Sequence, residues 1–292
     1  MRGANESRQR GPARRVLVVQ AAYLGDLVLT VPLFLSLKEA GFLVHAVARA
    51  GLEGFLEGLG LAERVFYLDK SRKNSDTLRI AKALGKEAYA AALVPHRTLR
   101  AQFLALASGA PVRVGFGRAF LTHRLPYVVD GRSEVERVLS LLEPLGVKPV
   151  GWRTLRPPEE ALERSRALVE EDGFVAIAPG ARWPTKRWLP SGWREVISTL
   201  ERRGERVVLL GTERELLAEI AEGTGALNLA GKTDTLTLFA LISRAKAFLS
   251  GDTGPAHLAA LAGVPQVLIM GPTHPKLGFV PPNPRLWVVQ VE

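Results

Sequence analysis

The chain contains no cysteine, which excludes disulfide bonds, thiolate nucleophiles and cysteine-ligated metal sites together. It has only five histidines, and these lack the His-x-x-x-His and His-Glu-x-x-His spacings of zinc sites, so we expect no metal. The longest stretch without a charged residue, from Thr253 to Pro275, is interrupted by prolines and glycines. Because these residues break helices, the stretch is not expected to span a membrane.

The chain does contain enough apolar residues for sizeable cores, since 47% of its 292 residues are hydrophobic and 23% are charged. Disorder as the main state is excluded, and the sequence shows no repeat of fixed period. The net charge of +10 predicts an anionic partner, which is nucleic acid, a phosphorylated metabolite or an acidic lipid surface. Nucleic acid is not expected, because the sequence has neither an aromatic-interleaved basic stripe nor a known nucleic-acid module.

The N-terminus is rich in arginine, and residues 1–15 are predicted to form a basic, disordered leader. The apolar run that follows, Val16–Val19, is too short for the core of a signal peptide, so we expect a cytoplasmic protein. An alternative role for the leader is attraction to anionic lipid headgroups, which would hold the protein peripherally at the inner face of the cytoplasmic membrane.

Short aliphatic runs alternate with apolar-rich helical segments along the chain, beginning with the strand Val16–Val19 and a predicted helix from Asp26 to Ala40. This alternation is typical of an α/β fold in which helices cover both faces of a parallel sheet. Residues 147–158 are rich in proline and glycine without a steady period, as in an interdomain linker. We therefore predict two Rossmann-like domains, residues 16–146 and 159–292, that face each other across a cleft.

The first candidate site is the loop after the strand Val16–Val19, where Gly25 lets the chain turn and Asp26 begins the predicted helix. Asp26 has two interpretations, an N-cap that accepts backbone hydrogen bonds or a carboxylate base at the cleft. The loop lacks the Gly-x-Gly-x-x-Gly sequence of a standard dinucleotide-binding turn.

The second candidate is the loop after the predicted strand 174–178, which carries Lys186 and Arg187. Its cations suit a diphosphate, with Lys186 as a point charge and Arg187 either assisting or facing solvent. The alternative is a solvated loop whose tryptophans pack on the domain. After the next strand, Glu213 either hydrogen-bonds a ribose hydroxyl or is simply favourable in a first helical turn.

The third candidate is the sequence Gly251-Asp252-Thr253-Gly254, which follows a predicted strand and leads into a helix. Amides at the start of that helix form an anion site, and the two glycines allow a ligand to approach the backbone closely. A capped structural helix explains much of the same pattern. His257, on this helix, is either a core histidine or a ligand contact.

These loops resemble three motifs of glycosyltransferase family nine, the heptosyltransferases, which have the GT-B fold of two Rossmann-like domains. The resemblance covers about 16–281 and is carried, in order, by residues 25–32, 179–188 and 251–257. It implies an enzyme of lipopolysaccharide and cell-envelope biosynthesis that uses a nucleotide sugar, typically ADP-heptose. The implied acceptor is the lipopolysaccharide core at the inner membrane face, and no further cofactor is implied.

The resemblance also implies roles for single residues. The aspartate after the first-strand glycine is the general base of the family, which implies Asp26, and the lysine of the Lys-x-Trp loop contacts the donor phosphates, which implies Lys186. The Asp-Thr-Gly loop with its helix holds the diphosphate and sugar, and an acidic residue after another strand meets the ribose. The donor-binding residues predicted in this way are Gly25, Arg187, Glu213, Asp252, Thr253, Gly254 and His257.

An inverting transfer needs a base opposite the leaving group and a cationic, amide-rich site for the departing nucleoside diphosphate. Asp26 can supply the base, and Lys186 with the helix start after Asp252 can supply the second site without a metal. Two other functions remain open, a GT-B nucleotide-sugar epimerase or hydrolase and a non-catalytic basic protein that binds nucleotides or membrane surfaces. Members of the family usually continue for a few dozen residues to a helix that returns to the first domain, so we expect that element to be shortened or the interdomain contact to differ.

Overall fold

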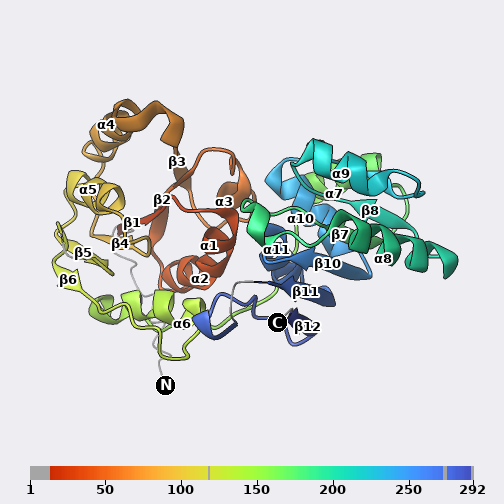
Figure 1. Cartoon of the computed structure of the whole chain (residues 1–292). Coiled ribbons are helices and arrows are strands. Elements are labelled where there is room, and N and C mark those ends of the chain that lie inside the picture. The colour runs from red at the N-terminus through yellow and green to blue at the C-terminus, as the bar shows by residue number, and fades with distance from the viewer. Residues whose placement is uncertain (1–13, 118, 272–274, 291–292) are drawn as a thin grey trace, which may run out of the picture.

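The computed structural model describes residues 14–117, 119–271 and 275–290, and within them it contains two six-stranded sheets whose strand pairs are all parallel (Figure 1). The N-terminal sheet consists of β1 (Arg15–Gln20), β2 (Leu43–Arg49), β3 (Arg64–Leu68), β4 (Ala91–Val94), β5 (Val112–Gly115) and β6 (His123–Arg124). The C-terminal sheet consists of β7 (Val175–Ala178), β8 (Val207–Leu209), β9 (Leu227–Asn228), β10 (Ala247–Gly251), β11 (Gln266–Met270) and β12 (Leu286–Gln290). The predicted α/β fold with two Rossmann-like halves is confirmed. Residues 1–13 of the predicted leader lie outside the described residues, and Arg15 already belongs to β1.

Both sheets follow the same doubly wound order, β3-β2-β1-β4-β5-β6 in one half and β9-β8-β7-β10-β11-β12 in the other. In each sheet the direction of winding reverses beside the first strand, between β1 and β4 and between β7 and β10. Ligands of open parallel sheets bind outside the carboxyl ends of the strands at this point. The loops after β1, β7 and β10 are the three that the sequence singled out.

Helices cover both faces of each sheet, and the strand residues show why. In β1, Val16 and Val18 point into a core that continues into the other half, whereas Leu17 and Val19 belong to a separate core. Every second position is thus buried on each face, as a sheet covered on both sides requires. The helices are α1 (Leu24–Leu29), α2 (Val31–Glu39), α3 (Phe55–Gly58), α4 (Lys73–Leu84), α5 (Leu99–Ala107), α6 (Glu134–Leu139), α7 (Glu159–Leu168), α8 (Pro190–Arg202), α9 (Arg214–Ala221), α10 (Thr235–Arg244) and α11 (Gly254–Ala262), with short 3₁₀ turns at Lys70–Arg72, Ser140–Leu145, Pro184–Lys186 and Pro275–Leu277. Within the described ranges, none of these helices has the length and apolar character needed to cross a bilayer.

The two halves share buried apolar surface. One continuous core contains side chains of α1 and α2 together with side chains of α10 and α11. The rings of Phe55 on α3 and Phe239 on α10 meet edge to face across this interface, with centroids 6.4 Å apart. The carboxyl ends of both sheets are therefore held next to each other, which Figure 1 shows as α1, α3, α10 and α11 meeting at the middle of the molecule.

The prediction of one helix from Asp26 to Ala40 is wrong, because the chain forms α1 and α2 with a break at Thr30. The hydroxyl of Thr30 donates to the Asp26 carbonyl at 2.7 Å and accepts from Nε2 of Gln20 at 2.8 Å. Pro32 has no N–H to donate, so it fits the first turn of a new helix rather than the interior of a longer one. Asp26 is consequently the third residue of a short helix whose N-cap is Tyr23.

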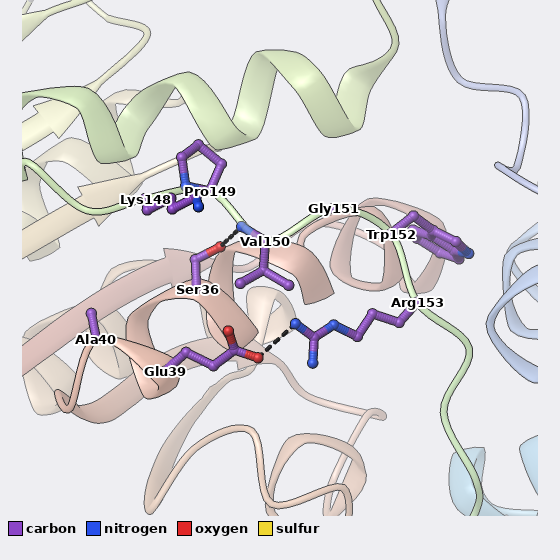
Figure 2. A pocket seen from close by; sticks show the side chains of 9 residues that line it. All are labelled: Ser36, Glu39, Ala40, Lys148, Pro149, Val150, Gly151, Trp152 and Arg153. Atoms are coloured by element: carbon purple, nitrogen blue, oxygen red, sulfur yellow. Dashed lines mark hydrogen bonds and ion pairs between the residues drawn. The ribbon is translucent and has the colours of Figure 1, made fainter.

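The segment 147–158 runs between the two halves and is fastened to α2 (Figure 2). The amide of Val150 donates to Oγ of Ser36 at 2.8 Å, and Arg153 pairs with Glu39 at 2.6 Å. A cavity of about 520 Å³ lies between α2 and this segment. Of its lining side chains, Arg153 and Glu39 bind each other, whereas Nε1 of Trp152 is buried and has no hydrogen-bond partner among the described residues. The cavity lies at the end of α2, just before β2, away from the candidate loops. The limits of the two domains stay predictions.

Candidate functional site

A cavity of about 700 Å³ lies between the two halves, at the carboxyl ends of β1, β7 and β10. The start of α1 forms one wall, and the loops after β7, β8 and β10 form the other. The sequence-predicted residues that line it are Gly25, Asp26, Lys186, Glu213, Asp252, Thr253, Gly254 and His257. The fold thus brings residues from both halves of the chain to one place, as predicted for a cleft between Rossmann-like domains.

Asp26 lies half-buried at the start of α1, and its Oδ2 accepts a hydrogen bond from the backbone N–H of Tyr23 at 3.2 Å. Burial raises the pKa of the Asp26 carboxyl above its usual range. The Tyr23 hydrogen bond and the charge of Lys70 lower this pKa, whereas the charge of Glu134 raises it. A carboxylate with a raised pKa is a stronger base, so Asp26 suits proton abstraction from a ligand in the cavity.

The starts of α1 and α11 touch beside the cavity because two glycines leave room for them. A Cβ on Gly25 would lie only 2.8 Å from Cδ2 of His257, and a Cβ on Gly254 would lie 3.1 Å from Cβ of Leu24. A side chain at Gly25 would force the His257 ring to move, and one at Gly254 would pack unusually tightly against Leu24, so both glycines favour close contact between the two halves. This packing role was not predicted, since the sequence suggested a chain turn at Gly25 and a ligand approach at Gly254.

His257 is buried at 6% exposure, with its ring against Gly25 and part of the side chain at the cavity. Burial lowers the pKa of His257 to about 4, although the charge of Asp252 opposes this shift. The imidazole is therefore neutral at pH 7 and can donate or accept a hydrogen bond, but it cannot supply positive charge. Its Nδ1 is buried and has no hydrogen-bond partner among the described residues.

Lys186 and Asp252 form an ion pair in the cavity, with Nζ and Oδ2 2.6 Å apart. Lys186 ends the 3₁₀ turn in the loop after β7, and Asp252 follows β10, so the pair joins neighbouring strands at the sheet's switch point. The side chains are 29% and 18% exposed. The carboxylate thus holds the ammonium group in the cavity in a fixed position, where an anion can reach it.

The start of α11 presents backbone amides next to this pair. Thr253 is the N-cap residue, but its side chain makes no capping hydrogen bond, and Pro255 occupies the first turn. Pro255 has no N–H, and the N–H of Ala256 donates to the Thr253 carbonyl at 3.1 Å, so the groups left for a ligand here are the Thr253 hydroxyl and the Gly254 amide. A helix N-terminus of this kind favours phosphate through its N–H groups and its dipole.

Glu213 lies against two glycines at the far side of the cavity. Its Oε2 accepts from the amide and hydroxyl of Thr212 at 3.1 and 3.2 Å. A Cβ on Gly180 would lie 2.5 Å from the same oxygen, so the glycine makes room for the carboxylate. Glu213 is therefore held at the carboxyl ends of β7 and β8, where a ribose could bind it.

Arg187 is not among the described residues that line the cavity. Its Nε donates to the carbonyl of Ala181 at 2.8 Å and so closes the loop in which Lys186 lies. Trp188 packs edge to face on Trp193, with ring centroids 5.2 Å apart. The structure thus gives Arg187 a place in holding the loop, and its contact with a donor stays a prediction.

A cluster of cations around Tyr23 was missed from the sequence. The guanidinium groups of Arg49 and Arg182 each lie 4.6 Å from the centre of the Tyr23 ring, and Nζ of Lys70 lies 5.8 Å away. Burial lowers the pKa of Lys70, and the charges of neighbouring arginines add to this effect. Arg49 ends β2 and Lys70 follows β3, so their positions at strand ends were a usable signal. We call Tyr23, Arg49, Lys70 and Arg182 the Tyr23 cation cluster.

Comparisons with known proteins identify the family of the chain. Residues 77–290 match glycosyltransferase family 9 (heptosyltransferase). Lipopolysaccharide heptosyltransferase 3 of Escherichia coli is 36% identical over 170 residues, covering 54% of this chain and 49% of that protein. This chain thus spans about half the length of that curated relative.

Two solved structures share the fold. The glycosyl transferase family 9 protein of Veillonella parvula DSM 2008 superposes with a TM-score of 0.86 at 23% identity, covering 95% of this chain and 87% of that one. The E. coli heptosyltransferase WaaC with ADP superposes with a TM-score of 0.80 at 21% identity, covering 95% and 93%. The predicted GT-B arrangement of the two halves is confirmed by these superpositions.

Proposed function

Because the chain belongs to glycosyltransferase family 9, we propose that it is an inverting, metal-independent glycosyltransferase. The donor we propose is a nucleoside-diphosphate sugar, ADP-heptose, and the acceptor is a hydroxyl of a lipopolysaccharide core or related glycolipid. The observation that carries the proposal is one cavity lined both by Asp26 and by the Lys186–Asp252 pair with the start of α11. The family match begins at residue 77, so the role of Asp26 rests on the geometry of this cavity.

The C-terminal half offers the donor site. Lys186, the Thr253 hydroxyl and the Gly254 amide would bind the diphosphate, and the Glu213 carboxylate would accept hydrogen bonds from the ribose hydroxyls. Lys186 and the start of α11 would stabilise the negative charge that develops on the oxygens of the leaving nucleoside diphosphate, which supports transfer without a metal. The E. coli neighbour solved with ADP supports the choice of nucleotide.

The N-terminal half offers the base. Asp26 would accept the proton of the acceptor hydroxyl while the hydroxyl oxygen bonds to the anomeric carbon of the donor sugar. The bond from that carbon to the diphosphate breaks on the opposite face of the sugar. The raised pKa of Asp26 supports this step, because the carboxylate then holds the transferred proton more strongly. Closure of the two halves around the reactants would exclude water and disfavour hydrolysis of the donor.

The Tyr23 cation cluster supports an anionic acceptor. It adjoins Asp26, since Tyr23 is the N-cap of the same helix, and it combines an exposed aromatic ring with three cations. Such a surface binds sugars that carry phosphate or carboxylate groups. We place the enzyme in the cytoplasm with peripheral contact to the inner membrane face, which the net charge of +10 supports.

The proposal is tested by incubating the chain with ADP-heptose in the presence and absence of a lipopolysaccharide core acceptor. A transferase consumes the donor only when the acceptor is present, and NMR of the product shows the anomeric configuration opposite to that of the donor. Donor consumption without acceptor would instead indicate a hydrolase or epimerase. A retained anomeric configuration would contradict the inverting mechanism.

A further inference from the structure

Arg137 on α6 is a buried charge that the proposed chemistry does not use. It is 2% exposed, and its Nε pairs at 2.8 Å with Oε2 of Glu134, which is 8% exposed. The guanidinium is also satisfied by the Arg132 carbonyl, which accepts from Nη1 at 2.6 Å. Buried ion pairs seldom add net stability compared with apolar residues, so a pair of this kind calls for another explanation.

The remaining bond of Arg137 crosses to the other half of the molecule. Its Nη2 donates to the carbonyl of Leu277 at 2.8 Å, a contact between residues 140 positions apart. Next to it, the backbone N–H of Glu134, the first residue of α6, donates to the carbonyl of Gly278 at 2.8 Å. Two consecutive carbonyls of the C-terminal half are thus bound by residues of α6. Figure 1 shows a blue segment of the C-terminal half lying beside α6.

Gly278 has the backbone conformation that this contact requires, and it has no Cβ to obstruct it. Its φ of +82° lies in the left-handed region, and a Cβ there would lie 2.4 Å from the carbonyl oxygen of Arg132 and 2.8 Å from Nη2 of Arg137. Glycine therefore satisfies both a backbone conformation and a close approach between the two halves. Any side chain at this position would push the Leu277–Phe279 segment away from α6.

The same segment reaches the candidate site. Phe279 lines the cavity, and its ring centre lies 5.7 Å from the Arg137 guanidinium. On the other side, Tyr127 donates its hydroxyl to Oε2 of Glu134 at 2.7 Å, and Arg97 lies over the Tyr127 ring at 3.9 Å. The buried pair therefore connects a loop at the carboxyl end of β4 with a cavity wall contributed by the C-terminal half.

We propose that Arg137 is a positioning residue that fixes the donor-binding half against the half that carries Asp26, through the Leu277–Phe279 segment. This inference rests on the proposed function, because the distance it sets is the one between base and donor. Arg137 itself does not bind the donor, because the proposed donor contacts are Lys186, Glu213 and the start of α11. Loss of the contact therefore lowers the rate of transfer and leaves nucleotide binding in place.

The test compares Arg137→Met, Arg137→Lys and Gly278→Ala with a matched control, Gly204→Ala. Gly204 also has a positive φ, of +79°, but a Cβ there meets nothing within 4 Å, so this variant imposes the backbone strain without the clash. Gly278→Ala keeps every buried charge and so remains informative if Arg137→Met does not fold. For each variant, kcat with ADP-heptose and acceptor, the Kd for ADP and hydrogen exchange of the 132–139 peptide are measured.

In Arg137→Met and Gly278→Ala we expect kcat to fall about 10-fold or more, with the Kd for ADP within about threefold of the wild-type value. Exchange of the Glu134 amide accelerates in both variants, Arg137→Lys recovers part of kcat, and Gly204→Ala behaves as wild type. A kcat in Gly278→Ala equal to that of Gly204→Ala overturns the inference, and so does a Kd for ADP that weakens as much as kcat falls. If the wild type transfers no sugar, the proposed function fails, and unchanged exchange in Gly278→Ala then overturns the contact independently.

Discussion

The Lys186–Asp252 pair gives the sharpest expectation for nucleotide binding. Lys186→Ala removes the cation that we assign to the diphosphate and leaves the Asp252 carboxylate, 2.6 Å from the former Nζ, without its partner. A bound diphosphate would then face an uncompensated negative charge. The lysine is therefore expected to matter twice, by attracting the ligand and by neutralising its neighbour.

The expected loss of ADP-binding free energy in Lys186→Ala follows from the distance between the two charges and from the exposure of their side chains. Two unit charges about 4 Å apart interact by about 4 kcal/mol at the effective dielectric near a protein surface, and fully exposed pairs contribute about 1 kcal/mol or less. The two side chains are 29% and 18% exposed, so the pair lies between these limits. We expect Lys186→Ala to weaken ADP binding by about 2–3 kcal/mol, which is roughly 30- to 150-fold in Kd.

A double variant separates the two effects. Lys186→Ala/Asp252→Asn removes the unpaired carboxylate as well, so it should bind ADP more tightly than Lys186→Ala, by about 10-fold. Isothermal titration calorimetry with ADP measures both values. The control is Lys246→Ala, which breaks an ion pair with Glu205 just before β10, at the end of that strand remote from the cavity, and should leave the Kd unchanged.

A folded Lys186→Ala variant that binds ADP as the wild type does would refute this reasoning. A double variant that binds more weakly than Lys186→Ala would show that Asp252 contacts the ligand favourably rather than repelling it.

Three further outcomes follow from the same cavity. The pKa of Asp26 is raised in the folded state, so its contribution to stability is present below its pKa in the unfolded chain and is lost as the pH rises through its pKa in the folded protein. Asp26→Asn should therefore raise the thermal midpoint at pH 7. Calorimetry should no longer find this increase near pH 3.5. The pKa of His257 is lowered to about 4, so its contribution to stability is present above about pH 6.5 and is lost as the pH falls towards 4. In His257→Gln the thermal midpoint should depend less steeply on pH within that window. An unaltered dependence would contradict the burial of a neutral imidazole. Gly25→Ala places a Cβ 2.8 Å from the His257 ring and should destabilise the fold by about 1–3 kcal/mol in denaturant titrations, whereas Gly271→Ala, where a Cβ meets nothing within 4 Å, should not.

Much of the fold was predictable because its strands are apolar and clearly bounded. The pattern of Val16–Val19, buried on both faces, already required helices on both sides of a parallel sheet. The break at Thr30 had a signal in the sequence, because Pro32 favours the first turn of a new helix. The hydrogen bond from Gln20 to the Thr30 hydroxyl could not be predicted, since the two residues meet only in the folded chain. The strands β6 and β9 have two residues each and are too short to show a period.

Within the site, residues at strand ends were predictable and contacts between the halves were not. Lys186 and Asp252 follow neighbouring strands of one sheet, so topology gathers them at one edge. Asp26 follows a strand of the other sheet, and only the packing of the two halves brings it to the same cavity. Arg137 gave no signal of that kind, because its partner at Leu277 lies 140 residues away and is a backbone carbonyl. The same holds for Gly25, whose need for glycine comes from a histidine on the opposite half.

The most direct test of the proposed mechanism is single-turnover transfer from ADP-heptose to a lipopolysaccharide core acceptor, measured for the wild type and for Asp26→Asn together with the Kd for ADP. With Asp26 as the base, the variant should bind ADP within about twofold of the wild type and transfer sugar about 10²- to 10⁴-fold more slowly. Transfer by Asp26→Asn at a rate within about threefold of the wild type would contradict the assignment of the base and, with it, the proposed reaction geometry.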